Sequence, residues 1–447
     1  MSSPDWDAAT QETVQNLARL IRLETVNPPG NEDLAVTTIK EILDREGIPQ
    51  DDYAIVESVP RRANLVVRLH GDGSKRPLLL SGHTDVVPVD REHWSRDPFG
   101  GEVVDGCVWG RGAIDMKGFL AMYLQIFLLA HRQKLPLKRD LILAAIADEE
   151  IGFQHGSKFL VDQHRSLVEA EYGISENGAM TIYFGKTRFY PIQVSERGYC
   201  WMKMSAHGLP GHGSLLHADN AIYQLATALE KIQRTRRFPI HLTPTFLRMM
   251  EAASDQLGFP AGMLPDLLRH SGIAGFILDR LPDENRNLLG SMITNTVTPT
   301  MLAAGSKANI IPTVAEAYLD CRMLPGQSSE DLMLEILAIT GDQVVLESLA
   351  SGAGTEFLVD SPFYRTLETA GRNMDPGGLF VPMLSPGATD ASEYQRTGVQ
   401  MYGFTPGVMP EGFPMIQLVH GHDERLPISF IRSGLPVLWE VLTRTAL

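Results

Sequence analysis

The sequence predicts an α/β fold, a mostly parallel sheet flanked by helices, with an α+β domain inserted into it. Helical segments alternate with short apolar strands in the first half of the chain, an order that is typical of a parallel sheet. The chain has 447 residues, which is more than one hydrophobic core usually holds. Beyond residue 197 the alternation gives way to successive strands and a long irregular segment.

The first half of the chain begins with two expected helices and continues with strands that are apolar throughout. The first helix ends at a breaker, the Asn-Pro-Pro-Gly of residues 27–30, and a second follows over about residues 32–45. Further apolar runs predict strands at residues 64–69, 77–81 and 141–147 and a helix over residues 119–129. Strand, helix and strand in this order indicate parallel neighbours in one sheet.

The middle of the chain has a different pattern, which predicts a second domain over residues 198–350. Its strands and helices surround a stretch near residues 238–289, where Pro, Met and Leu are scattered and strand character is low. We interpret this stretch as a helical insertion. Short α/β units return from residue 351, so residues 1–197 and 351–447 are expected to form one domain that the second interrupts.

Composition and charge argue against several classes of protein. Hydrophobic residues make up 44% of the chain and charged residues 21%, which is typical of a globular protein and not of a disordered one. The formal net charge of -15 argues against nucleic acid as a partner, because phosphates require a basic surface. No apolar run approaches the roughly 20 residues that cross a bilayer, so no membrane partner is expected.

The cysteines and the N-terminal residues predict a cytoplasmic location. Cys107, Cys200 and Cys321 are far apart in the sequence and lack the spacing of a disulfide framework or a thiolate zinc site. The N-terminal residues show no basic segment followed by an apolar one, as a secretory signal would.

A histidine and an aspartate follow the apolar strand expected at residues 77–81. His83 and Asp85 are two residues apart, and such residues point to the same side of an extended chain. Asp85 can therefore accept a hydrogen bond from one imidazole nitrogen of His83 while the other nitrogen binds a metal ion. The pair predicts a metal site at the carboxyl end of the strand.

Two further segments place carboxylates at similar positions. Asp115 lies in a glycine-rich turn before a helix, where it can bridge two cations or, alternatively, cap the helix. Asp148, Glu149 and Glu150 end an apolar strand, and three adjacent anions favour bound cations or raised pKa values. One glutamate can bind metal while its neighbour acts as a general base. The alternative is a solvated acidic loop.

Glu176 and His420 complete the candidate ligands. Glu176 follows a short apolar strand and His420 lies near the C-terminus, and each on its own is equally well a loop residue. Together the candidates offer nitrogen and oxygen ligands without thiolates, which suit zinc, cobalt or manganese. We therefore predict a hydrolytic site with two divalent metal ions, zinc being the first choice.

The segments at residues 81–85, 110–118 and 148–152 resemble those of the two-metal exopeptidase and amidohydrolase family. This family includes aminoacylase, carboxypeptidase S, glutamate carboxypeptidase and succinyl-diaminopimelate desuccinylase. The resemblance extends from Thr25 to Glu424. It implies a catalytic domain of the zinc-exopeptidase type and an inserted domain that acts as a lid or in dimerisation.

The resemblance also implies the ligands of each metal ion. One ion would be held by Asp115, His83 and Glu176, and the other by Asp115, Glu150 and His420. Glu149 matches the general base, and Asp85 the residue that orients His83. His422 is a rival to His420, which is favoured by the register of the acidic residues that follow.

Further matches concern the substrate. His212 matches a histidine that helps to hold the substrate carbonyl, often from the partner subunit of a dimer. Asn309 and Arg322 match the substrate-binding edge of the inserted domain, where Arg322 is a carboxylate clamp or, alternatively, part of a surface ion pair. Gly387 and Thr389 lie in a loop whose counterpart receives the substrate carboxylate on backbone N–H groups.

The family implies hydrolysis of an amide bond next to a free carboxylate, in a small substrate such as an N-acyl amino acid. A dipeptidase or carboxypeptidase is the alternative, and deamination or carbamate cleavage uses the same metal chemistry. A binding protein without activity is disfavoured, because it needs no base such as Glu149. The insertion resembles that of the longer members, carboxypeptidase S and its animal N-acyl amino acid hydrolase relatives. The sequence leaves open whether it permits a homodimer.

Overall fold

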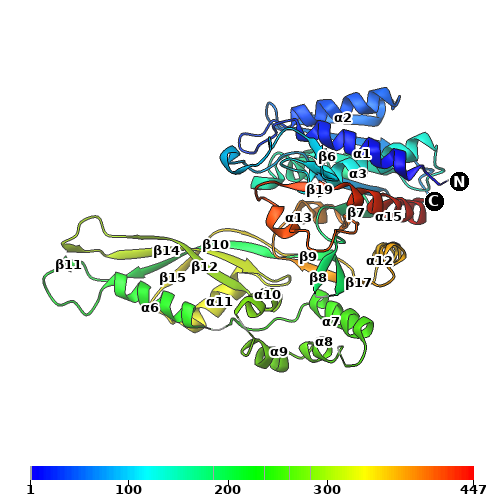
Figure 1. The fold of residues 1–447 in the computed structure, drawn as a ribbon. Coiled ribbons are helices and arrows are strands. Elements are labelled where there is room, and N and C mark those ends of the chain that lie inside the picture. The colour runs from blue at the N-terminus through cyan, green and yellow to red at the C-terminus, as the bar shows by residue number, and fades with distance from the viewer. Residues whose placement is uncertain (1–2, 185, 236, 261, 282) are drawn as a thin grey trace. The chain divides into compact units, whose positions relative to one another are not determined.

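The structure, a computed structural model, describes residues 3–184, 186–235, 237–260, 262–281 and 283–447. The chain forms two compact units, whose elements are labelled in Figure 1. The first comprises Met1–Val194, Phe357–Pro382 and Thr389–Leu447, and the second comprises Ser195–Glu356 and Met383–Ala388. Residues 351–356 and 383–388 thus cluster with the second unit, whereas the sequence assigned them to the domain that contains the chain ends.

A twisted sheet forms the centre of the first unit. Its strands follow the order β1-β2-β6-β3-β7-β18-β9, in which β6, β3, β7 and β18 are parallel neighbours and the outer pairs are antiparallel. Strands β3 (Leu78–His83) and β6 (Leu141–Ile146) are buried along their whole length, as expected of apolar strands that are covered on both faces. The predicted α/β fold with a mostly parallel sheet is confirmed.

The other strands of this unit are short or lie toward the edges. They are β1 (Tyr53–Glu57), β2 (Ala63–Leu69), β4 (Glu102–Val104), β5 (Cys107–Trp109), β7 (Tyr172–Ser175), β8 (Ile182–Phe184), β9 (Thr187–Glu196), β17 (Leu379–Ser385), β18 (Gln400–Gly403) and β19 (Arg425–Pro427). Strands β4, β5 and β19 form a small separate sheet.

Three long helices of the first unit pack against one another. They are α1 (Trp6–Ile21), α3 (Lys117–Arg132) and α15 (Ile428–Ala446) (Figure 1), and α3 also packs on β3 and β6. Asp5 caps the N-terminus of α1: its carboxylate accepts hydrogen bonds from the backbone N–H groups of Asp7 and Ala8. Among the described residues, none of the helices has both the length and the apolar character that crossing a bilayer requires.

The remaining helices of this unit are α2 (Asp33–Arg45), α4 (Ser157–Gln163), α5 (Arg165–Val168), α12 (Pro362–Met374), α13 (Ala391–Tyr394) and α14 (Met415–Leu418). Single 3-10 turns lie at Gln50–Asp52, Arg91–His93, Glu149–Ile151 and Gln395–Thr397.

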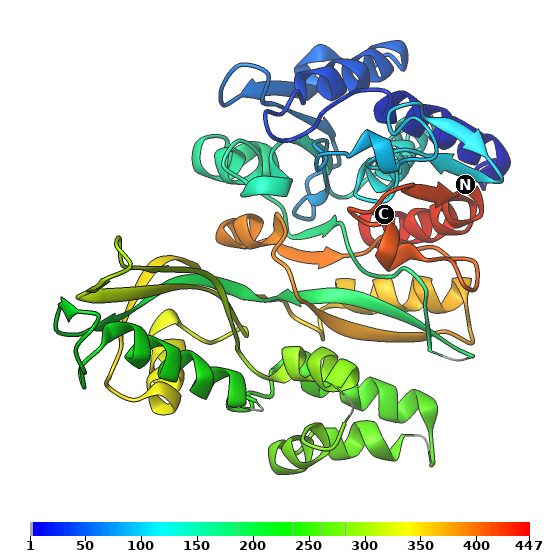
Figure 2. The same cartoon turned by 60° about the vertical axis from the view of Figure 1, so that its left-hand side comes forward.

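An antiparallel sheet of four strands and two helices packed on it form one part of the second unit (Figure 2). Its order is β12 (Thr296–Ala304), β14 (Val314–Met323), β10 (Gly198–His207) and β15 (Val345–Gly352). Alternate residues of β14 are buried, and α6 (Ala221–Arg234) and α11 (Ser329–Thr340) cover that side. This unit therefore has a hydrophobic core of its own.

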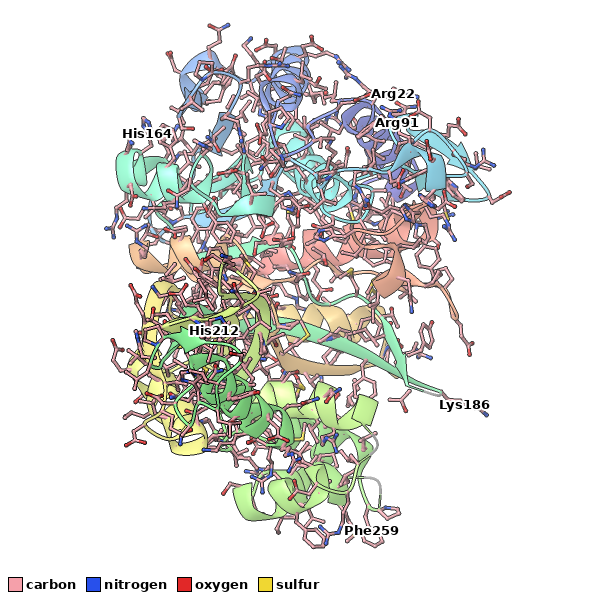
Figure 3. The ribbon with its side chains drawn as sticks, turned by 90° about the vertical axis from the view of Figure 1, so that its left-hand side faces the viewer. Arg22, Arg91, His164, Lys186, His212 and Phe259 are labelled. Carbon is pink, nitrogen blue, oxygen red and sulfur yellow. The ribbon has the colours of Figure 1, made fainter. Side chains whose placement is uncertain are left out.

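Four helices occupy most of the stretch that the sequence indicated as a helical insertion. They are α7 (Pro244–Leu257), α8 (Met263–Leu268), α9 (Ser271–Leu278) and α10 (Asp283–Ile293). Phe259, which follows α7, is exposed (Figure 3). Short strand pairs complete the unit: β11 (Gly211–His212) pairs with β13 (Ile310–Ile311), and β16 (Thr355–Glu356) pairs with the end of β9.

Two of the three cysteines are neighbours in the second unit. Cys200 on β10 lies directly opposite Cys321 on β14, and both are buried free thiols. Their long separation in the sequence concealed this pairing, because strand register is not visible from spacing.

Candidate metal centre

The candidate ligands gather at the carboxyl ends of neighbouring parallel strands. β3 ends at His83, β6 is followed by Glu149 and Glu150, and β7 is followed by Glu176. β3 lies between β6 and β7 and runs parallel to both, so the three strand ends meet at one edge of the sheet. The apolar strands thus bring together the polar residues that follow them.

His83 is fully buried, and its two ring nitrogens face different partners. Nε2 lies 3.1 Å from Asp115 Oδ1 and 3.6 Å from Glu176 Oε2. Nδ1 lies 3.0 Å from the backbone carbonyl of Asp85 and 3.4 Å from its carboxylate. The nearer acceptor is the carbonyl rather than the predicted carboxylate, because β3 ends at His83 and the alternation of a strand does not continue to Asp85.

The loop that carries Asp115 is held by the buried carboxylate of Glu424. Its oxygens accept hydrogen bonds of 2.7–3.0 Å from the backbone N–H groups of Gly112, Ile114 and Asp115. The Arg111 guanidinium donates to the same carboxylate at 2.7 Å, and both of these side chains are almost fully buried. The C-terminal part of the chain therefore braces the loop.

Replacing Arg111 by methionine should destabilise the protein by about 3–5 kcal/mol, because it leaves the Glu424 carboxylate buried without its counter-ion. Denaturant unfolding of the metal-free protein measures the change. Arg91→Met is the control: its partners Glu24 and Asp97 are exposed, and such surface pairs contribute about 0–1 kcal/mol. Equal stability losses in the two variants would contradict the bracing role.

Two groups of candidate ligands share Asp115. The groups are His83, Asp115 and Glu176, and Asp115, Glu150 and His420, and within each group the ligand atoms lie within 4.8 Å of one another. His420 Nε2 is 3.1 Å from Asp115 Oδ2 and 3.2 Å from Glu150 Oε2. Asp115 thus presents Oδ1 to one group and Oδ2 to the other, as a bridging carboxylate must. It does not cap α3, whose N-cap residue is Met116.

The chemistry of these groups fits two cations. Glu150 Oε1 is buried and has no hydrogen-bond partner among the residues described, so this ligand retains an unused oxygen. Imidazole nitrogens and carboxylate oxygens together are the donors that zinc, cobalt and manganese accept. The three cysteines belong to neither group.

Burial changes the proton affinities in this cluster. It raises the pKa of Glu150 to about 7 and the pKa of Glu149 well above its ordinary value. Hydrogen bonds to Asp115 and Glu150 raise the pKa of His420 to about 10. The cluster therefore retains protons that bound cations would displace. A solvated acidic loop does not describe it, since the Glu149 and Glu150 side chains are only 11% and 4% exposed.

Glu149 lies beside the ligands without belonging to either group. Its Oε2 is 4.0 Å from His83 Nε2, whereas the neighbouring Glu150 reaches His420. The backbone N–H groups of both glutamates donate to the Asp85 carboxylate at 3.2 Å. The two neighbouring side chains therefore point to different places, as they must if one binds a metal ion and the other acts as a general base.

Substitution of the two C-terminal histidines should distinguish the rival ligands. His422 belongs to neither ligand group and stacks on His93, with ring centroids 5.1 Å apart. His420→Ala is expected to bind one metal ion where the unaltered protein binds two, and His422→Ala to bind both. Elemental analysis of metal-loaded, desalted protein measures the ratio. If His420→Ala still binds two ions, His420 is not a metal ligand.

His212 and Asn309 lie close together in the second unit. His212 forms β11 with Gly211, and its Nδ1 is 2.7 Å from Ser214 Oγ (Figure 3). The carbonyl of Asn309 accepts the N–H of Gly213 at 3.1 Å, beside the pairing of β11 with β13. The predicted contacts of both residues with substrate remain predictions.

Arg322, Gly387 and Thr389 complete the predicted substrate residues. Arg322 lies on β14 of the second unit, where its Nε is 3.1 Å from Asp320 Oδ1, so the guanidinium already has one carboxylate partner. Gly387 belongs to the second unit and its N–H donates to Ser385 Oγ at 3.3 Å. Thr389 belongs to the first unit and accepts the N–H of Ala391 at 3.2 Å.

The sheet and its site define the class of protein: a metallohydrolase whose candidate ligands lie at the carboxyl edge of a parallel sheet. Residues 79–444 match Peptidase family M20/M25/M40, and the chain belongs to this family. The family identified from the sequence motifs is therefore confirmed, and the protein is a hydrolase.

Named relatives and solved structures agree with this assignment. The chain is 27% identical to Aminoacylase-1 of Sus scrofa, over 95% of this chain and 93% of the relative. It is 26% identical to the N-fatty-acyl-amino acid synthase/hydrolase PM20D1 of Mus musculus, over 86% of this chain and 77% of the relative. The fold matches the M20 family metallo-carboxypeptidase Sso-CP2 from Sulfolobus solfataricus with a TM-score of 0.69 at 17% identity, covering 96% of this chain and 98% of that one.

One further solved structure shares the fold. It is the YXEP protein of Bacillus subtilis, described as a dinuclear metal binding peptidase from the M20 family. The two chains share the fold, with a TM-score of 0.59 at 12% identity, over 99% of this chain and all of the other.

Proposed function

We propose that the protein hydrolyses the amide bond of N-acyl amino acids, next to the free carboxylate of the amino acid. One observation carries this proposal: Glu149 lies beside two ligand groups that share Asp115. The similarity to Aminoacylase-1 and to an N-fatty-acyl-amino acid synthase/hydrolase supports the substrate class.

The proposed cofactors are two divalent metal ions, zinc in the first place, with cobalt or manganese as alternatives. Asp115 would bridge them, with His83 and Glu176 on one ion and Glu150 and His420 on the other. Such ions polarise the substrate carbonyl and lower the pKa of water.

The side chains of the site have separate roles in catalysis and in substrate binding. Glu149 takes the proton of the attacking water and later delivers it to the leaving amine, so that the C–N bond breaks and an acid and an amine result. His212 would stabilise the oxyanion, a role that for one donor contributes about 3–4 kcal/mol. Arg322 and Asn309 would bind the substrate, and the loop with Gly387 and Thr389 would receive its carboxylate.

The domain roles complete the proposal. Residues 198–350 would act as a lid whose closure brings His212 and Arg322 to the site and excludes water. A homodimer that supplies His212 from the partner subunit is an alternative route to the same arrangement. The three free cysteines support a cytoplasmic location.

A dipeptidase or carboxypeptidase is the second candidate. The dipeptidase Dug1p from Saccharomyces cerevisiae shares the fold, with a TM-score of 0.65 at 16% identity over 98% of this chain and 96% of the other. Deamination or carbamate cleavage would use the same ligand groups with another substrate.

Amine release from a panel of N-acyl amino acids and dipeptides tests the proposal. The protein is loaded with zinc, cobalt or manganese, and a chelated sample is the control. Metal-dependent release from the blocked amino acids alone is the expected result. Release from dipeptides alone would replace the proposal by the peptidase, and no release with two metal ions bound would contradict both substrate classes.

A further inference from the structure

The loop after α1 contains Asn27, a buried residue to which the proposed function gives no role. Backbone hydrogen bonds fix this loop. The N–H of Asn27 donates to the Val86 carbonyl at 2.9 Å, and the N–H of Val86 donates to the Thr25 carbonyl at 3.0 Å. Thr25 Oγ1 also donates to the Thr84 carbonyl at 2.6 Å. The loop is therefore held independently of the Asn27 side chain.

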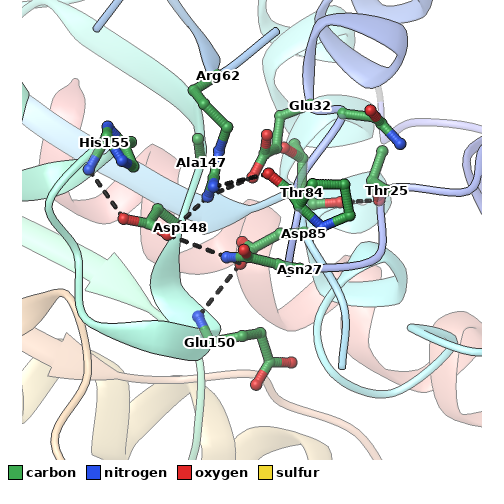
Figure 4. Close-up of polar contacts among 12 residues, drawn as sticks. Thr25, Asn27, Glu32, Arg62, Thr84, Asp85, Ala147, Asp148, Glu150 and His155 are labelled. Atoms are coloured by element: carbon green, nitrogen blue, oxygen red, sulfur yellow. Dashed lines mark hydrogen bonds and ion pairs between the residues drawn. The ribbon is translucent and has the colours of Figure 1, made fainter. Parts of the chain in front are cut away.

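The side-chain amide of Asn27 lies between two buried carboxylates (Figure 4). Nδ2 donates to Asp85 Oδ2 at 2.8 Å and to Asp148 Oδ1 at 3.0 Å. An amide nitrogen has two hydrogens, one for each carboxylate, and the opposite orientation would place an oxygen against both anions. The amide thus joins two side chains that would otherwise repel each other.

Both carboxylates help to fix the backbone conformation at Glu149 and Glu150. Asp85 Oδ1 accepts the N–H of Glu149 and Asp85 Oδ2 accepts the N–H of Glu150, each at 3.2 Å. Asp148 directly precedes the two glutamates and has a φ of 67°, in the left-handed region that residues with a side chain rarely adopt. Its Oδ2 accepts the N–H of His155 at 2.9 Å, which helps to hold this turn.

Arg62 holds Asp148 from another side (Figure 4). Nη2 donates to Asp148 Oδ1 at 2.6 Å and lies 3.0 Å from Glu32 Oε1, and Nη1 donates to the Pro29 carbonyl at 3.1 Å. The Arg62 side chain is 7% exposed, so these contacts are shielded from water. Asn27 is the link between this ion-paired carboxylate and Asp85.

We propose that Asn27 is a positioning residue for Glu149 and Glu150. Its amide sets the separation of the Asp85 and Asp148 carboxylates. These two carboxylates fix the backbone at Glu149 and Glu150 and so set the direction in which the two glutamate side chains point. Asn27 acts through its neighbours and contacts neither of the ligand groups directly. The inference rests on the roles proposed above for Glu149 and Glu150.

The variants Asn27→Asp and Asn27→Ala separate positioning from packing. Aspartate keeps the shape of the side chain but removes the donor and adds a third anion, whereas alanine only removes atoms. At a pH of about 8, Asn27→Asp is expected to lower kcat about 10- to 100-fold with little change in KM, and to lower it more than Asn27→Ala does. A role in packing alone would give the reverse order, with near-normal kcat in Asn27→Asp, and would overturn the inference.

Cobalt titration of the metal-free protein gives a readout that does not depend on substrate. Because Glu150 is displaced, Asn27→Asp should bind cobalt about 10- to 100-fold more weakly. Thr25→Val is the matched control: it removes the bond to the Thr84 carbonyl in the same loop, touches neither carboxylate, and should keep normal kcat and cobalt affinity. Thermal unfolding checks that each variant is folded.

The two readouts also separate this inference from the proposed function. Unchanged kcat and cobalt affinity in both Asn27 variants would overturn the positioning role alone. An unaltered protein that binds no cobalt would overturn the metal centre, and with it the inference.

Discussion

Replacing Glu149 by glutamine should reduce kcat about 10²- to 10⁴-fold while both metal ions remain bound, because a neutral amide cannot take a proton from water. The substitution keeps the size of a side chain that is 11% exposed, and it removes no member of either ligand group. Metal content should therefore be unchanged. KM should change much less than kcat, since the proton transfer belongs to the chemical step.

Amine release and elemental analysis on the same samples measure both quantities. Glu169→Gln, at an exposed position outside the ligand groups, is the control and should behave as the unaltered protein. Turnover at the normal rate in Glu149→Gln would remove this residue from the mechanism. Loss of a metal ion from this variant would instead show that Glu149 is a metal ligand.

Replacing Asp115 by alanine is expected to weaken binding of both metal ions and to reduce turnover to background. Asp115 is the side chain that both ligand groups contain, with one oxygen directed to each. Its removal also takes one carboxylate partner from each of the imidazoles of His83 and His420, which within the two groups then face Glu176 and Glu150, respectively. The effect should therefore exceed that of His420→Ala, which touches one group only.

Metal titration of the apoprotein and its thermal unfolding with and without added zinc test this expectation. The unaltered protein should be stabilised by zinc, since a ligand that binds only the folded state raises stability by mass action. Asp115→Ala should lose most of that gain. Asp97→Asn, an exposed aspartate outside both groups, should retain it. A single ion retained at full affinity in Asp115→Ala would argue against a bridging role.

The sequence alone was sufficient for the central strands and the residues that follow them. β6 is apolar throughout and β3 begins with three leucines, and such runs can be recognised in a sequence because burial on both faces permits no polar alternation. His83 ends β3 and Glu150 follows β6 within four residues, so a local pattern predicted their place at the sheet edge. The edge strand β1 was missed: its apolar run over residues 53–56 is short, and none of its residues is buried.

The supporting residues could not be predicted, because their partners are distant in the sequence. Arg111 and Glu424 form a buried ion pair across 313 residues, and no spacing rule connects them. Asn27 was visible only as part of a helix breaker, although its side chain joins two carboxylates at the site. Hydrogen bonds of this kind depend on side-chain direction, which periodicity does not reveal.

The position of His420 and Glu424 near the end of the chain has a consequence for the order in which the protein matures. During synthesis the N-terminal parts of a chain fold first. The group of His83, Asp115 and Glu176 is translated long before His420, so a growing chain has the candidate ligands for one cation but not for two. The brace that Glu424 provides for the Asp115 loop arrives equally late. A growing chain thus lacks the second candidate ligand group, and the Glu424 brace, until the residues just before α15 have been made.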